Sequence, residues 1–159
     1  MKKQGFTLIE LMVVIVIMGI LAAVAVPKLF GMIAKSKASE VPTAAGTWIN
    51  LQDAFVAENN VVGDWGQIGY TAPGAKQNNA SNQFKSKEFY YLGGNGTWAA
   101  GNLNKLNDCA AENNTATHWT LTAAATGSNS GTMTVTAGGD AGCKTLTPSF
   151  DGLARANAQ

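Results

Sequence analysis

Residues that commonly carry catalysis or nucleic-acid binding are scarce in this sequence. Charged residues make up only 13% of the 159 residues, the formal net charge is +1, and His118 is the single histidine. Since no cluster of basic residues offers a footprint for phosphates, we expect no specific nucleic-acid partner. His118 has no obvious Ser or Cys partner in the sequence, which argues against an exported hydrolase. We therefore predict no catalytic residue and a surface or sheet-edge position for His118.

Long apolar runs are also few, but one dominates the N-terminal region. The 21 residues from Phe6 to Val26 contain one charge, Glu10, and as a helix they would extend about 31 Å, enough to cross a hydrocarbon core of about 30 Å. Lys2 and Lys3 precede the run, and positive residues stay on the cytoplasmic side. We therefore expect a single span in the inner (cytoplasmic) membrane, with the C-terminal part exported.

Glu10 makes two simple interpretations of this run unsatisfactory. An unpaired carboxylate in hydrocarbon costs about 2.5 to 3.5 kcal/mol, so a plain membrane anchor does not explain Glu10 or the polar residues 1–5. A cleaved secretory signal peptide, for which "LAAVAV" offers a cleavage-like site, has a shorter apolar core without a charge at its start. Glu10 is therefore expected to have a partner.

Cysteine is represented only by Cys109 and Cys143, both in the part expected to be exported. An even number of cysteines in such a compartment favours a disulfide, which would close a 35-residue loop and stabilise the fold by about 4 kcal/mol on the chain-entropy model. Two free buried thiols are the alternative. These cysteines and His118 have no ligand-like spacing, so we expect no metal and no cofactor. Asp140 and Asp151 lack the spacing of a calcium loop and are interpreted as turn residues.

The segment "GFTLIELMVVIVIMGILAAVAVP", residues 5–27, resembles the class III signal of type IV prepilins and type II secretion pseudopilins. The resemblance implies that a prepilin peptidase cuts between Gly5 and Phe6 and methylates the new amine of Phe6. It also implies that the helix polymerises into a filament, where Glu10 meets the Phe6 amine of a neighbouring subunit. Because residues four apart share a helix face, pairing of Glu10 with the Phe6 amine of its own chain is the alternative.

The same resemblance suggests partners and a location for the chain. The partners are the chain itself in a homopolymeric filament, the prepilin peptidase, the pilus assembly machinery and the inner membrane, with minor pilins and insoluble polysaccharide as further candidates. The assembled product would lie at the cell surface. Gly19 and Pro27 match positions between which the family helix melts during assembly, although both residues are tolerated in membrane helices as simple kinks.

Beyond Pro27 the sequence predicts an α+β fold, in which a long N-terminal helix packs on a small antiparallel β-sheet, the pilin fold. Ala44, Trp48, Leu51 and Phe55 form an apolar stripe that would cover the sheet, and Pro42 predicts a kink or a helix restart near Ser39. Helix stop signals are Asn59 and Asn60. Strands are predicted at 87–92, 118–124, 131–137 and 144–147, after a structured loop at 61–85. The organisation is a leader at 1–5, a transmembrane and filament-core helix at 6–27, an amphipathic helix at 28–58 and an exported head at 59–159.

Three functions are compatible with these features. The first is a structural subunit of a type IV pilus serving adhesion or motility, and not an enzyme. The second is a type II secretion pseudopilin, whose head often carries a calcium site in place of a disulfide loop, so the cysteine pair favours a true pilin. The third is a membrane-anchored adhesin, with Trp65 and Trp98 in Gly-rich loops as a stacking platform for carbohydrate.

Overall fold

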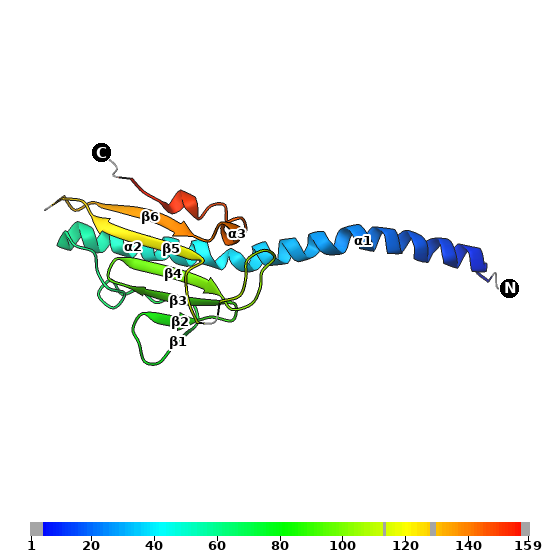
Figure 1. Cartoon of the computed structure of the whole chain (residues 1–159), viewed down its shortest axis with the longest axis horizontal. Coiled ribbons are helices and arrows are strands. Elements are labelled where there is room, and N and C mark those ends of the chain that lie inside the picture. The colour runs from blue at the N-terminus through cyan, green and yellow to red at the C-terminus, as the bar shows by residue number, and fades with distance from the viewer. Residues whose placement is uncertain (1–4, 113, 128–129, 157–159) are drawn as a thin grey trace. The chain divides into compact units, whose positions relative to one another are not determined.

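The computed structural model describes residues 5–112, 114–127 and 130–156, so residues 1–4 of the predicted leader lie outside it. The chain divides into two compact units, Met1–Ile33 and Ala34–Gln159. Two helices come first, α1 (Leu8–Ala38) and α2 (Glu40–Asn59), followed by the strands of one sheet (Figure 1). The fold is α+β, as predicted.

The boundary between α1 and α2 lies at Ser39, where the predicted helix restart is confirmed. Pro42 has no N–H to donate to the carbonyl three to four residues earlier, which interrupts the helical ladder. The Thr43 hydroxyl donates instead to the Ser39 carbonyl at 3.1 Å. At its other end, α2 terminates at Asn60, a left-handed residue with φ 59° whose N–H donates to the Val56 carbonyl at 2.8 Å. The predicted stop is thus confirmed.

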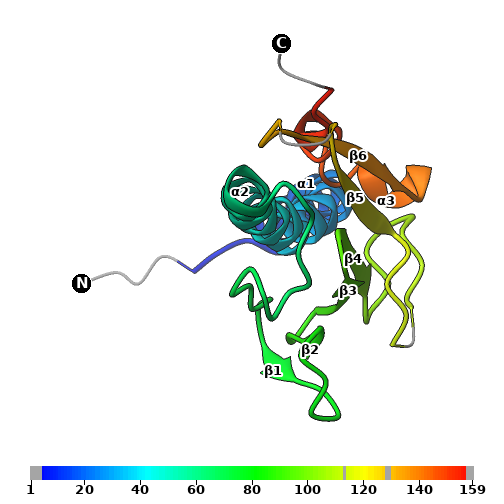
Figure 2. The same cartoon turned by 90° about the vertical axis from the view of Figure 1, so that its left-hand side faces the viewer.

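One antiparallel sheet of six strands follows, and each strand pairs with the next along the chain (Figure 2). The strands predicted at 87–92, 118–124 and 131–137 are confirmed as β3, β5 and β6, with their ends shifted by one or two residues. The strands are β1 (Ala75–Lys76), β2 (Gln83–Lys85), β3 (Phe89–Gly94), β4 (Thr97–Asn102), β5 (Trp119–Ala125) and β6 (Met133–Gly139). The predicted hairpin is formed by β5 and β6, and residues 128 and 129 of its turn lie outside the described residues.

The strand prediction at 144–147 is wrong. That region contains the end of the short helix α3 (Ala141–Lys144), followed by turns and the 3-10 helix η1 (Asp151–Leu153). The Asp140 carboxylate accepts hydrogen bonds from the N–H groups of Gly142 at 2.9 Å and Cys143 at 3.1 Å, which caps α3. Asp140, predicted as a turn residue, is instead the N-cap of this helix.

The apolar stripe of α2 faces the sheet, but its centre differs from the prediction. Helix α2 contacts β4, β5 and β6. Trp48 is fully buried there as expected, whereas Leu51 and Phe55 are only partly buried at the flank. Gln52, which the apolar pattern leaves out, is 0% exposed. The buried face is Val41, Ala44, Ala45, Trp48, Ile49, Gln52 and Val56.

Tryptophan fills much of the core between α2 and the sheet. Trp65 and Trp98 are both 0% exposed, so the prediction of an exposed stacking platform made of these two residues is wrong. The Trp65 indole N–H donates to the Thr97 carbonyl at 2.9 Å, and that of Trp98 donates to the Tyr70 hydroxyl at 2.9 Å. Each ring therefore has its polar edge satisfied inside the protein and presents no face to solvent.

Candidate functional site

Helix α1 begins with a reciprocal pair of caps between Thr7 and Glu10. The backbone N–H of Thr7 donates to Glu10 Oε2 at 2.8 Å, and its hydroxyl donates to the same oxygen at 2.7 Å. In return, the N–H of Glu10 approaches the Thr7 hydroxyl oxygen at 3.4 Å. This is a capping box, in which residues three apart satisfy two otherwise unpaired donors at a helix start. The carboxylate also lies at the positive end of the helix dipole.

The capping box gives Glu10 a neutral partner, Thr7, where only a charged one was expected from the sequence. The signal was present in the sequence as Thr-x-x-Glu before an apolar run. Both donations from Thr7 go to Oε2, and among the residues that the structure describes Oε1 accepts no hydrogen bond. Phe6, next to this cap, is 89% exposed. One carboxylate oxygen of Glu10 thus stays available for a further donor.

Around the rest of this unit, α1 is apolar on all sides. Large apolar side chains from Leu8 to Ile33 are exposed in every direction, a pattern typical of a helix that lies in a membrane or in a bundle. By length and composition, the helical region Leu8–Asn59 includes one segment apolar enough to cross a membrane. Gly19 and Pro27 both lie within continuous α1. Their proposed extension on assembly stays a prediction.

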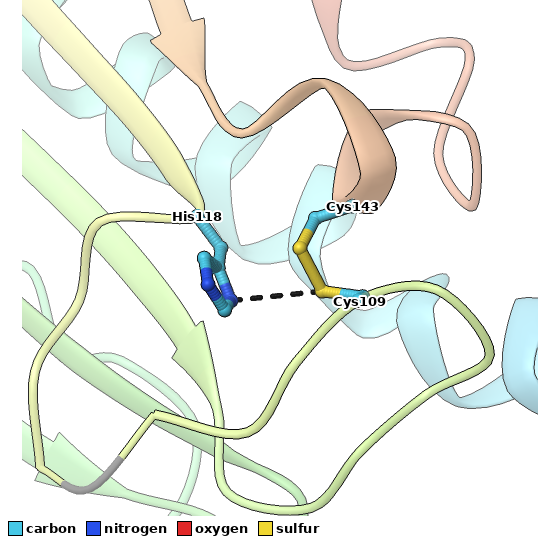
Figure 3. A group of neighbouring side chains, drawn as sticks. All are labelled: Cys109, His118 and Cys143. Carbon is cyan, nitrogen blue, oxygen red and sulfur yellow. Dashed lines mark hydrogen bonds between the residues drawn. A yellow bond between two sulfur atoms is a disulfide. The ribbon is translucent and has the colours of Figure 1, made fainter.

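A second candidate site surrounds the disulfide between Cys109 and Cys143, which confirms the predicted pairing (Figure 3). Both cysteines are 0% exposed. Cys109 lies in the connection between β4 and β5, and Cys143 lies in α3. The disulfide therefore ties the segment after β6 to the connection between β4 and β5.

His118 lies beside this disulfide, immediately before β5. Its Nδ1 is 3.6 Å from Cys109 Sγ and 2.5 Å from Asn102 Oδ1 (Figure 3 draws the sulfur contact). The Glu112 carboxylate approaches the same nitrogen at 3.6 Å. His118 was predicted at the surface or a sheet edge, but its side chain is only 12% exposed and it precedes β5, which lies between β4 and β6, so that prediction is wrong.

No metal was expected from the sequence, because Cys109, Cys143 and His118 have no ligand-like spacing along the chain. The fold nevertheless brings these three residues together. Atoms of Cys109, His118 and Cys143 that could ligate a metal lie within 4.8 Å of one another, although 34 residues separate the cysteines. In the disulfide neither sulfur is a thiolate, which is the form that binds metals. Asn102 and Glu112 were missed altogether because neither belongs to a local motif. Only the fold brings them to His118.

Comparison with known proteins bears on the first of these sites. Residues 1–26 match the family model described as the prokaryotic N-terminal methylation motif. The N-terminal segment thus has the sequence pattern of this motif. The matched segment contains Gly5, Phe6, Thr7 and Glu10, and it includes the capped start of α1 and the helix as far as residue 26.

Relatives of the chain include both pilins and a secretion protein. The chain is 41% identical over 70 residues to the type IV major pilin protein PilA of Myxococcus xanthus, covering 43% of this chain and 32% of the relative. It is 40% identical over 62 residues to the type IV major fimbrial protein FimA of Dichelobacter nodosus (39% and 40%). It is 44% identical over 60 residues to the type II secretion system core protein G of Vibrio cholerae (38% and 41%). The chain thus matches 32 to 41% of the length of these relatives, and its α+β fold is pilin-like.

Proposed function

We propose that this chain is a structural subunit of a type IV pilus, and not an enzyme. One observation carries the proposal: a methylation motif opens an apolar helix whose first turn holds a single carboxylate, Glu10. In this proposal a prepilin peptidase cleaves the bond between Gly5 and Phe6 and methylates the new amine. The inserted precursor then polymerises through α1 into a surface filament that serves adhesion or motility.

The geometry at Glu10 supports a role for this residue in assembly. Cleavage converts the peptide nitrogen of Phe6 into a cation, four residues before Glu10. Oε2 already accepts two hydrogen bonds from Thr7, which leaves Oε1 for the amine of a neighbouring subunit. A lone carboxylate inside a bundle of apolar helices is costly, whereas a paired one specifies register. Pairing would therefore select subunits in the correct axial position.

The apolar helix also supplies the proposed membrane and filament interfaces. The precursor would cross the inner membrane once, with the head at 59–159 outside. During assembly the segment from Gly19 to Pro27 would extend, because glycine is a weak helix former and Pro27 cannot donate a backbone hydrogen bond. The partners are further copies of the chain, the prepilin peptidase and the assembly machinery, together with minor pilins.

A type II secretion pseudopilin is the second candidate function. The observation in its favour is the 44% identity to the core protein G of Vibrio cholerae. The Cys109–Cys143 disulfide weighs toward the pilus subunit instead. The adhesin alternative loses its motivating residues, since Trp65 and Trp98 are buried.

Mass spectrometry of the N-terminus, combined with electron microscopy of sheared surface material, tests the proposal. A pilus subunit is expected to begin at Phe6 with a methylated amine and to occur in abundant filaments. A processed chain that stays in the envelope without filaments would favour the pseudopilin. An inner-membrane chain that keeps Met1 would contradict both.

A further inference from the structure

We propose that the dithiol form of this protein carries a site for Zn²⁺ or a cation of the same class, made by Cys109, Cys143, His118 and Glu112. This site lies in the Ala34–Gln159 unit and is independent of the filament role proposed for α1. It is formed by residues from the connection between β4 and β5 and from α3 (Figure 3). Metal and disulfide are mutually exclusive occupants of the same two sulfurs.

Distances at His118 match those of a tetrahedral zinc centre. With Zn–S bonds of about 2.3 Å and Zn–N bonds of about 2.0 Å, a sulfur and a nitrogen on one ion lie about 3.5 Å apart. Cys109 Sγ and His118 Nδ1 are 3.6 Å apart. The Sγ atom of Cys143 lies within 4.8 Å of both. The two sulfurs, once unbonded, need only rotate to separate by about 3.8 Å.

The ligand atoms that lie within 4.8 Å of one another belong to Cys109, His118 and Cys143, so Glu112 would become the fourth ligand by turning its carboxylate toward the sulfurs. Its Oε2 lies 3.6 Å from His118 Nδ1, close to the separation of about 3.3 Å for a nitrogen and a carboxylate oxygen on one zinc ion. Thr117 keeps this carboxylate near His118, since its N–H donates to Oε2 at 3.0 Å and its hydroxyl bonds to Oε1. Such outer hydrogen bonds orient a metal ligand. The Glu112 side chain is only 11% exposed, so little solvent competes for the ion.

Asn102 prepares the polar surroundings of the site. The side chain is 0% exposed, and its Nδ2 donates to the carbonyls of Asn104 at 2.8 Å and Ala110 at 2.7 Å. These bonds orient Oδ1 toward Cys109 and His118, and it lies 3.1 Å from Cys109 Sγ. In the disulfide form Oδ1 accepts a hydrogen bond from His118 Nδ1. A metal ion bound to Nδ1 of His118 would replace this hydrogen bond.

The chemistry balances as follows. A dithiol reductant transfers two electrons to the disulfide and is itself oxidised to a disulfide, while Cys109 and Cys143 each take up one proton. Metal binding then releases these two protons, because thiolates are the ligands, and the His118 proton moves from Nδ1 to Nε2. A newly exported chain has the dithiol form before oxidation, so no reductant is needed there. A bound metal would delay disulfide closure. When a disulfide oxidant takes two electrons from the two thiolates and two protons from water and becomes a dithiol, the Cys109–Cys143 bond forms and the metal ion is released.

Cobalt titration of the full detergent-solubilised chain tests this site. The protein is reduced with a dithiol, freed of reductant without oxygen and titrated with Co²⁺, then with Zn²⁺. The expected result is one Co²⁺ per chain, with a thiolate charge-transfer band and the intense visible bands of tetrahedral cobalt, both lost when Zn²⁺ is added. The oxidised chain should show neither. Reduced protein without these bands would overturn the proposal, whether or not it keeps its near-ultraviolet circular dichroism.

Two variants assign the ligands without removing the cysteines. His118→Ala and Glu112→Gln should each weaken cobalt binding at least about 10-fold. Asp108→Asn is the matched control for Glu112→Gln, because it makes the same charge change next to Cys109 on an exposed side chain and should bind like the wild type. Circular dichroism of the oxidised variants verifies folding. Unchanged affinity in His118→Ala, or equal affinity in Glu112→Gln and Asp108→Asn, would contradict the assigned ligand set.

Discussion

The side chain of Gln52 exchanges two hydrogen bonds with the backbone of Gly63. Its Nε2 donates to the Gly63 carbonyl at 2.6 Å, and the Gly63 N–H donates to Oε1 at 3.0 Å. The side-chain amide thus pairs with the backbone N–H and carbonyl of Gly63 as a neighbouring strand would. Gln52 itself is 0% exposed. Through this pair, α2 fixes the start of the segment that leads to the sheet.

Replacing Gln52 should destabilise the Ala34–Gln159 unit. Gln52→Leu keeps the volume but leaves the N–H of Gly63 unpaired, while the Gly63 carbonyl keeps only the N–H of Gly96 at 3.3 Å, which should lower the unfolding free energy by about 1 to 3 kcal/mol. Urea titration followed by tryptophan fluorescence measures this loss, since all four tryptophans lie in that unit. Gln67→Leu is the control, because the exposed Gln67 accepts one hydrogen bond from the Asp64 N–H at 2.8 Å. Equal losses in the two variants would contradict the role of Gln52.

Alkaline pH should weaken the fold through two buried tyrosines. Burial raises the pKa of Tyr70. The pKa of Tyr91 is raised by burial and by its hydrogen bond to the Glu40 carboxylate at 2.6 Å. Above about pH 10 the unfolded chain loses these protons while the native chain keeps them, so the native state binds more protons and its stability falls. The expected slope is about 1.4 kcal/mol per pH unit for each tyrosine.

Tyr91→Phe isolates one of these contributions. The variant should lose about half of the alkaline decline, whatever its starting stability at pH 8. Urea titrations between pH 8 and 11 measure the slope, and absorbance of phenolate in the native protein reports ionisation directly. A slope equal to that of the wild type would show that Tyr91 ionises in the native state.

Glu10→Ala should separate processing from assembly. Removing the carboxylate should leave membrane insertion and cleavage after Gly5 intact but strongly reduce filament number, because the Phe6 amine then has no partner. Thr7→Ala removes the capping donors to Glu10, at a cost of about 0.5 to 2 kcal/mol to the helix start, while keeping the charge, and should still assemble. Electron microscopy counts filaments, and mass spectrometry verifies cleavage. Normal filament numbers in Glu10→Ala would sink the assembly role.

Removal of the disulfide should have a large effect on stability. The cysteines are 34 residues apart, and the chain-entropy model assigns about 4 kcal/mol to closing a loop of this size. The double variant Cys109→Ser/Cys143→Ser should therefore shift the urea midpoint far down, and the metal-free reduced wild type should behave similarly. A loss below about 1 kcal/mol would mean that strain offsets the entropic gain.

Local signals made several features predictable from the sequence. The apolar run from Phe6, the restart at Ser39 and the stop at Asn60 each depend on a few neighbouring residues, so the pattern alone predicts them. Cysteine count predicted the disulfide. The strands richest in aromatic and β-branched residues, β3, β5 and β6, were found for the same reason.

Other features depend on contacts between distant segments. β4 consists of Thr, Trp, Ala, Gly and Asn, which have little strand preference together, and it is a strand because β3 and β5 pair with both its edges. Gln52 looks like a solvent-facing residue until Gly63 is placed beside it. His118 has no partner nearby in sequence, yet the fold surrounds it with Asn102, Glu112 and the disulfide.

The sequence by itself thus determined the N-terminal helix, its match to the methylation motif and the broad α+β class, because hydropathy, helix periodicity and capping act over a few residues. Only the tertiary structure decided which polar groups are buried together. A buried polar group needs a hydrogen-bond partner, and when that partner lies in a distant segment no local pattern records it.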